Sequence, residues 1–134
     1  MKTIKKSIIT NKRTELLDIT NVIQKEINDS KFNNGIVVIF TPHTTAGITI
    51  NENADPDVKI DIDYKINKLI PKNDPNYLHS EGNSDSHLKS SIFSPSISLI
   101  FEDNKLILGV WQAIYFCEFD GPRHRKYYIK IIPD

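Results

Sequence analysis

The spacing of apolar residues changes once along this sequence, near Ser94, and this change limits what the chain can fold into. Before that point, apolar residues recur every three or four positions in two segments, which predicts amphipathic helices beside short strands. After it, they alternate with polar residues, which predicts strands. A chain of 134 residues can bury one core and is too short for two ordinary domains, so we expect one domain over residues 1–134.

Three segments carry helix signals. The first helix is expected to start at Asp18 or Thr20 and to end at residues 33–35, and the second to be capped by Asp55 and to end before Pro71. A third, short helix is predicted from the cap Asn83 to Ser91. The apolar faces of the first two follow the helical repeat, with Ile19, Val22, Ile23 and Ile27 in one and Val58, Ile62, Ile66 and Leu69 in the other.

The remaining apolar segments predict strands. Residues 3–10 read as an edge strand, residues 48–50 as a second strand, and residues 35–41 as a continuous apolar strand covered on both faces. Residues 97–99 and a long central strand over 105–118 form a predicted hairpin, and residues 127–132 close the sheet. Within the long strand we expect Trp111 to lie in the core and Cys117 to be a buried, unreactive thiol.

Charge and hydropathy exclude several classes of protein. Seventeen basic and seventeen acidic residues balance without long runs of one sign, which argues against a general nucleic-acid or membrane-surface binder. The N-terminal residues contain no apolar segment of signal length, and no apolar run approaches a bilayer span. We therefore expect a cytoplasmic protein with no nucleic-acid or membrane partner.

Three of the four histidines lie on turn-forming segments. His79 and His87 bound the segment HSEGNSDSH, and His43 opens HTTAG directly after the strand predicted at 35–41. A helix beginning at Asn83 would bring His87 close to His79. Imidazole is the commonest metal ligand and titrates nearest physiological pH, so these residues are the first candidates for a site.

The candidate site supports two kinds of chemistry, which can coexist. In one, His43, His79 and His87 hold a divalent metal, zinc-like or magnesium, with an open position for water and with Glu81 or Asp85 as proton acceptor. In the other, the histidines bind a phosphate together with Arg123 and Arg125, which share one face of an extended segment. Structural roles also exist: the histidines can merely hydrogen-bond their loop, Thr44 and Thr45 can satisfy turn amides, and Glu118 can pair with Arg123. His124 is expected to be solvated.

Five stretches together resemble the YjbQ-type family of small bacterial and archaeal proteins, some of them described as secondary thiamine-phosphate synthases. They are DIT at 18–20, PHTTAGITINEN at 42–53, HSEGNSDSH at 79–87, LGVWQ at 108–112 and EFDGPRHR at 118–125. Two positions depart from the family pattern: Asn104 replaces a turn glycine, and Val110 replaces a threonine. Asparagine tolerates a left-handed turn, so we expect the first change to be mild.

The resemblance implies an α+β fold of packed mixed β-sheets, sandwich-like, with about three flanking helices. It also implies a homotrimer with a site near the subunit contacts, and a small phosphorylated metabolite as ligand. Residues carried across as catalytic are His43, His79, His87 and Glu81, with the three histidines also as metal ligands. Those carried across as substrate-binding are Thr44, Thr45, Asp85, Glu118, Arg123 and Arg125.

Three functions follow as hypotheses, and we favour an enzyme. The first is a transferase that joins a pyrimidine diphosphate to a thiazole phosphate, as the resemblance implies. The second is a metal-dependent hydrolase of a phosphorylated or acylated small molecule, with Glu81 as base. The third is a trimeric protein that binds a ligand without turnover.

Overall fold

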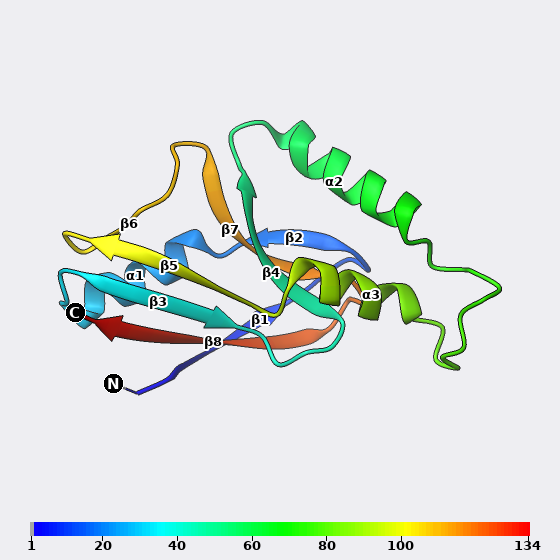
Figure 1. The fold of residues 1–134 in the computed structure, drawn as a ribbon, viewed down its shortest axis with the longest axis horizontal. Helices are drawn as coiled ribbons and strands as arrows, with labels where there is room; N and C mark the ends of the chain where they lie inside the picture. Colours follow the sequence, from blue (N-terminus) through cyan, green and yellow to red (C-terminus); the bar gives the residue numbers. More distant parts are fainter. Residues whose placement is uncertain (1) are drawn as a thin grey trace.

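Two antiparallel β-sheets and three helices form the fold, which this computed structural model describes for residues 2–134 (Figure 1). The larger sheet has the order β1–β8–β3–β5–β6, with bounds β1 Ile4–Ile9, β8 His124–Pro133, β3 Gly35–Phe40, β5 Ser96–Glu102 and β6 Lys105–Leu106. The smaller sheet has the order β2–β7–β4, with bounds β2 Glu15–Asp18, β7 Gln112–Glu118 and β4 Ala46–Glu52. The helices are α1 Thr20–Ser30, α2 Pro56–Leu69 and α3 Ser84–Phe93.

This architecture confirms the expected α+β class with packed sheets and three flanking helices. The strand pairings in residues 2–134 are all antiparallel, so the sheets are antiparallel where the resemblance implied mixed ones. β1 is an edge strand and β7 is the central strand of its sheet, both as predicted. No helix among the described residues is long and apolar enough to cross a membrane.

The main core lies between the inner faces of the two sheets. Alternate residues of β8 point into it, and Tyr127, Ile129 and Ile131 are almost completely buried there. A smaller cluster around Cys117 and Phe119 lies on the other face of β7. Cys117 is fully buried, as expected, and burial raises the pKa of its thiol.

Local signals set the starts of α1 and α2, whereas Asn83, the expected cap of α3, makes no side-chain capping hydrogen bond. Thr20 N donates to Asp18 Oδ1 over 2.9 Å at the start of α1, and Asp57 N donates to Asp55 Oδ1 over 2.9 Å at the start of α2. α1 stops at Lys31, which is in the left-handed conformation with φ 61°, earlier than the predicted stop. α2 has the predicted bounds, but none of its residues is buried. α3 extends two residues beyond the predicted end.

The predicted strand over residues 105–118 is wrong in its middle. β6 ends at Leu106 in the larger sheet and β7 begins at Gln112 in the smaller one, so the chain leaves one sheet for the other and cannot continue its alternation. Val110 is 91% exposed and Trp111 63% exposed, which overturns the prediction that Trp111 lies in the core. Asn104 has φ 62° in the preceding turn, the left-handed conformation expected at this departure from the family pattern.

Two further expectations need correction. β2 was not predicted, because its four residues carry too short a pattern to be recognised. β3 is covered on one face only: Val37 and Ile39 are fully buried, whereas Ile36 and Phe40 are 44% and 40% exposed. The cause is that α1 and the smaller sheet pack against the same face of the larger sheet.

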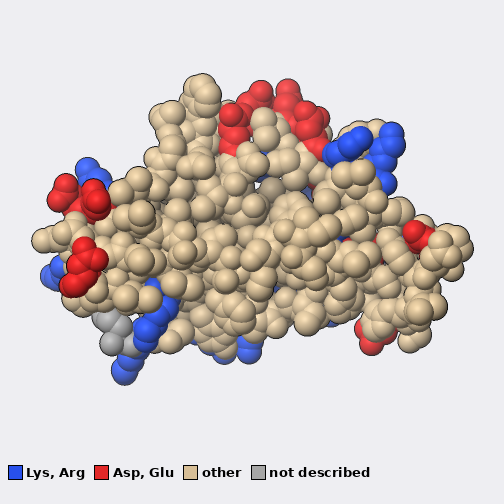
Figure 2. Space-filling view, viewed as in Figure 1, with Lys and Arg blue, Asp and Glu red and all other residues tan. Residues whose placement is uncertain are grey.

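The other face of the larger sheet carries apolar side chains. We call it the outer face and define it by Ile36, Phe40, Ile100 and Ile132, which strand register places on one side of β3, β5 and β8. Phe40 stacks on Tyr128 with ring centroids 6.4 Å apart. Figure 2 shows few charged residues across the centre of the molecule in this view, with most of them at its margins.

Candidate functional site

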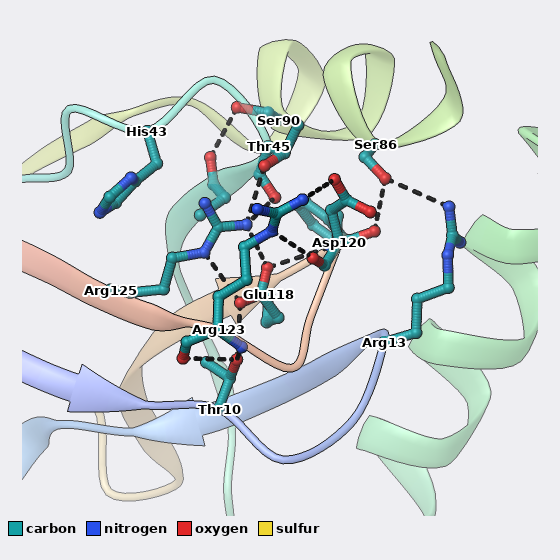
Figure 3. A network of polar contacts seen from close by, with 12 residues as sticks. Thr10, Arg13, His43, Thr45, Ser86, Ser90, Glu118, Asp120, Arg123 and Arg125 are labelled. Carbon is teal, nitrogen blue, oxygen red and sulfur yellow. Dashed lines mark hydrogen bonds and ion pairs between the residues drawn. The ribbon is translucent and has the colours of Figure 1, made fainter. Parts of the chain in front are cut away.

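A buried ion pair between Glu118 and Arg125 joins the two sheets. Glu118 ends β7 in the smaller sheet, and Arg125 lies near the start of β8 in the larger one. Arg125 Nε donates to Glu118 Oε1 over 2.8 Å, and Nη2 donates to Oε2 (Figure 3). Glu118 also accepts from Thr10 Oγ1 over 2.7 Å and from the Asp120 amide over 3.0 Å. The structural pair suggested for Glu118 and Arg123 is therefore formed with Arg125 instead.

The protein holds this pair in its charged form. Burial alone raises the pKa of the Glu118 carboxyl, but hydrogen bonds from Arg125, Thr10 and the Asp120 amide outweigh it, and the net pKa is lowered. Arg125 Nη2 donates in addition to Thr45 Oγ1 over 2.8 Å and to the Thr45 carbonyl over 3.3 Å. No hydrogen bond from residues 2–134 engages Arg125 Nη1. One arm of a firmly held guanidinium is thus available to a ligand.

Arg125 lines a polar cavity of about 340 Å³, which we call the arginine cavity. Seven of the ten predicted site residues meet there: His43, Thr44, Thr45, Glu81, His87, Arg123 and Arg125. Pro42, Asn83 and Asp120 complete the lining. His79, Asp85 and Glu118 are not part of it.

Asp120 organises the outer side of the arginine cavity, and sequence reasoning missed it. Arg123 Nε donates to the Asp120 carbonyl over 2.7 Å, and Nη2 donates to Asp120 Oδ2 over 2.9 Å. Asn83 Nδ2 donates to the same oxygen over 2.8 Å. Behind them, the Arg123 amide donates to Thr10 Oγ1 over 2.8 Å. The sequence signal that could have indicated Asp120 is its position three residues before Arg123 in a turn that contains Pro122. This pattern is too common to predict a site.

His43 is held by the backbone of β8. Its Nε2 accepts from the Lys126 amide over 3.0 Å, which assigns the proton of the neutral ring to Nδ1. Burial lowers the pKa of His43, and the nearby Arg125 lowers it further, so the ring is neutral at pH 7. A neutral His43 is a hydrogen-bond donor at Nδ1 and has no lone pair left for a metal in this arrangement.

His79 and His87 lie close together, as the spacing predicted. Their rings pack edge to face with centroids 5.3 Å apart, and His79 Nε2 is 3.6 Å from Glu81 Oε2. No group of three or more His, Cys, Asp or Glu side chains in the described part of the chain is arranged to hold a metal ion. The three predicted ligands therefore do not meet as a set within one chain. Metal binding itself stays a prediction.

Asp85 belongs to a second buried cluster, away from the arginine cavity. Its carboxylate accepts two hydrogen bonds of 3.0 Å from Arg13 and one of 2.9 Å from Lys89 Nζ. Lys89 is itself fully buried and also donates to Asn67 Oδ1 of α2. Burial raises the pKa of Asp85, but these cations outweigh it and lower the pKa overall. Asp85 therefore fixes the first turn of α3, and hence the helix that carries His87, to its surroundings.

These lowered carboxyl pKa values imply a stability that depends on pH. A carboxyl whose pKa is lower in the folded than in the unfolded chain stabilises the fold above its unfolded pKa, and this contribution is lost as the pH falls through the folded value. From Glu118 and Asp85 we expect the urea midpoint to be nearly constant from pH 8 to 6 and to decline below about pH 4.5. The corresponding loss of unfolding free energy is on the order of 2 kcal/mol. Urea titrations at fixed pH would measure it. A midpoint unchanged down to pH 3 would contradict the lowered pKa values of both carboxyls.

Together, the fold and the site define a class: a small α+β domain in which an inter-sheet glutamate–arginine pair presents a guanidinium to a histidine-lined cavity. Within that class, the chain belongs to the family described as "UPF0047 protein YjbQ-like", whose model matches residues 5–134. This confirms the family resemblance seen in the motifs.

Individual relatives agree with this assignment. The chain is similar to the UPF0047 protein MJ1081 of Methanocaldococcus jannaschii, with 58% identity over 97% of this chain and 94% of the relative. It is 49% identical to the UPF0047 protein YugU of Bacillus subtilis, over 93% and 95% of the two chains. The crystal structure of an uncharacterised YjbQ/UPF0047 protein from Clostridium acetobutylicum has 51% identity and a TM-score of 0.94, covering 96% of this chain and 99% of that one. None of these names states an activity.

Proposed function

We propose that the arginine cavity binds the phosphate of a small phosphorylated metabolite and that the protein is an enzyme resembling a secondary thiamine-phosphate synthase. Such an enzyme joins a pyrimidine diphosphate to a thiazole phosphate and releases diphosphate. The observation that carries the proposal is Arg125, which lines the cavity and whose guanidinium is fixed by Glu118 and Thr45 while no described residue forms a hydrogen bond with its Nη1. A donor fixed in advance stabilises a negatively charged leaving group without reorganising.

Neighbouring side chains can also contact the bound phosphate. Arg123 is held by Asp120 with its side chain half exposed, so it can reach a phosphate oxygen at the cavity mouth. His43 offers an Nδ1 proton, and Thr44 lines the same cavity. A second cavity of about 390 Å³ shares His43, Thr44 and His87 and is bordered by Phe40 and Pro95, which gives space for an apolar ring beside the phosphate.

A metal-dependent hydrolase is the second candidate. The paired rings of His79 and His87 favour it, because imidazole is a common ligand of zinc-like ions, but with Glu81 they form no three-ligand set arranged for a metal among the described residues. His43 does not fit as the third ligand while its Nε2 accepts from Lys126. A ligand-binding protein without turnover would use the arginine cavity in the same way, and a turnover assay separates it from an enzyme.

We further propose the homotrimer that the resemblance implies, in the cytoplasm, with no nucleic-acid or membrane partner. The apolar outer face supports self-association, because a face with four exposed large apolar residues is unusual for a monomer surface. Phe40 belongs to this face and also borders the second cavity, so a subunit contact here would lie beside the site. The solution mass and metal content of the purified protein test the trimer and the metal.

The phosphate site is tested by the substitution Arg123→Gln. We expect about a tenfold loss of affinity for inorganic phosphate and diphosphate in titration calorimetry, because one charge-assisted contact is removed. Folding should be little changed, since the Arg123 side chain is 53% exposed. Lys105→Gln, an exposed site in β6 outside the cavity, is the control. If the unmodified protein binds neither anion and forms no thiamine phosphate from the two precursors, the proposed function is wrong.

A further inference from the structure

Each arginine of the arginine cavity already has a carboxylate partner. Arg125 pairs with the buried Glu118, and Arg123 pairs with Asp120 at 2.9 Å. Glu81 is a third carboxylate nearby, and it lines the cavity as Asp120 does, whereas Glu118 lies outside the lining. The cavity and its surroundings thus hold two guanidinium groups and three carboxylates, which is an excess of one negative charge.

The neighbouring histidine does not change this balance at neutral pH. His43 is kept neutral by burial and by Arg125, and its contact with the Lys126 amide fixes the neutral form. A phosphate dianion in the cavity therefore gains two directed cationic contacts but also faces the Glu81 carboxylate. Repulsion from an unmatched like charge reduces affinity unless the ligand supplies a positive charge of its own.

We infer that the natural ligand is a phosphate ester that carries a positively charged nitrogen a few bonds from phosphorus. The inference rests on the proposed function and narrows its substrate class. The phosphate contacts Arg125 and Arg123, and the cationic nitrogen contacts Glu81. The positive charge of such a ligand offsets the Glu81 carboxylate, which a simple phosphate ester does not do.

Glu81 is better placed than Asp120 to receive the cation. Asp120 Oδ2 already accepts hydrogen bonds from Asn83 and Arg123. The Glu81 side chain is 70% exposed and has one ion-pair contact in the described chain, at 3.6 Å from His79. A carboxylate with this much open surface can meet an ammonium group without breaking a network that supports the fold.

The test compares two esters that differ by one charged group. Titration calorimetry at pH 7 would measure 2-aminoethyl phosphate, ethyl phosphate and inorganic phosphate on the full-length protein. We expect the aminoethyl ester to bind about tenfold more tightly than the ethyl ester. In Glu81→Gln the ratio should fall to about threefold or less, because the amine loses its partner and the ethyl ester loses a repulsion. Glu102→Gln, at an exposed site in β5, should keep the full preference.

The outcomes separate a failure of the inference about the cationic nitrogen from a failure of the proposed phosphate site. If both esters bind with equal affinity, the inference about charge is wrong while the phosphate site stands. If the preference survives in Glu81→Gln, the cation does not contact Glu81 and the inference is also wrong. If neither the esters nor inorganic phosphate bind, the proposed function fails and takes the inference with it.

Discussion

We expect the Glu118→Ala variant to lose about 3–5 kcal/mol of unfolding free energy. The substitution leaves Arg125, which is 6% exposed, as a buried cation with no carboxylate beside it. It also removes the nearer of the two acceptors of the Thr10 hydroxyl and the acceptor of the Asp120 amide. Because these contacts join β7 of one sheet to β8 of the other, their loss weakens the packing between the sheets.

Urea denaturation followed by circular dichroism would measure this loss. Lys25→Ala serves as the control, since Lys25 forms an exposed ion pair with Asp29 within α1 and should change stability by less than about 0.5 kcal/mol. A loss below about 1 kcal/mol in Glu118→Ala would show that Arg125 finds another partner or enough water. The pair would then not be the element that holds the two sheets at the site.

The positions of the site histidines could be predicted from the sequence because each lies near a helix cap or the end of a strand. The cap at Asn83 predicted a helix that returns His87 to His79, and the rings do meet. The strand before HTTAG predicted that His43 follows a buried segment, and His43 lies just beyond β3. Local periodicity and capping thus place side chains that are few residues apart.

The partners of the buried carboxylates were not accessible in the same way. Asp85 pairs with Arg13 across 72 residues, and nothing near either residue signals the contact. Glu118 was matched to Arg123 or left as a ligand contact, yet β8 begins at His124 and its alternation points Arg125 inward to Glu118. The same limit explains Trp111: residues 107–111 are apolar apart from Gly109 and resemble a continuing strand, yet the chain changes sheets there.

The double variant Glu118→Leu with Arg125→Met should separate folding from ligand binding. Replacing both members of a buried ion pair by apolar side chains of similar size is often neutral, whereas removing one member is costly. Thr10 and Thr45 lose partners, so we expect a residual loss of about 1–2 kcal/mol, well below that of Glu118→Ala. Affinity for inorganic phosphate should fall by about 10- to 100-fold, because the fixed guanidinium is gone.

The two measurements on this variant bear on different claims, which is why it is more informative than Arg125→Met alone. Arg125→Met leaves Glu118 buried and uncompensated, so lost binding could follow from a disturbed fold. In the double variant that charge is absent, and urea denaturation can show that the sheets still pack. A folded double variant that keeps full phosphate affinity would mean that Arg125 serves the fold only, and phosphate recognition would then have to rest on Arg123 and the histidines. A folded double variant without phosphate affinity would establish that one ion pair has two roles, since Glu118 stabilises the junction of the sheets and, by doing so, aims Arg125 into the cavity.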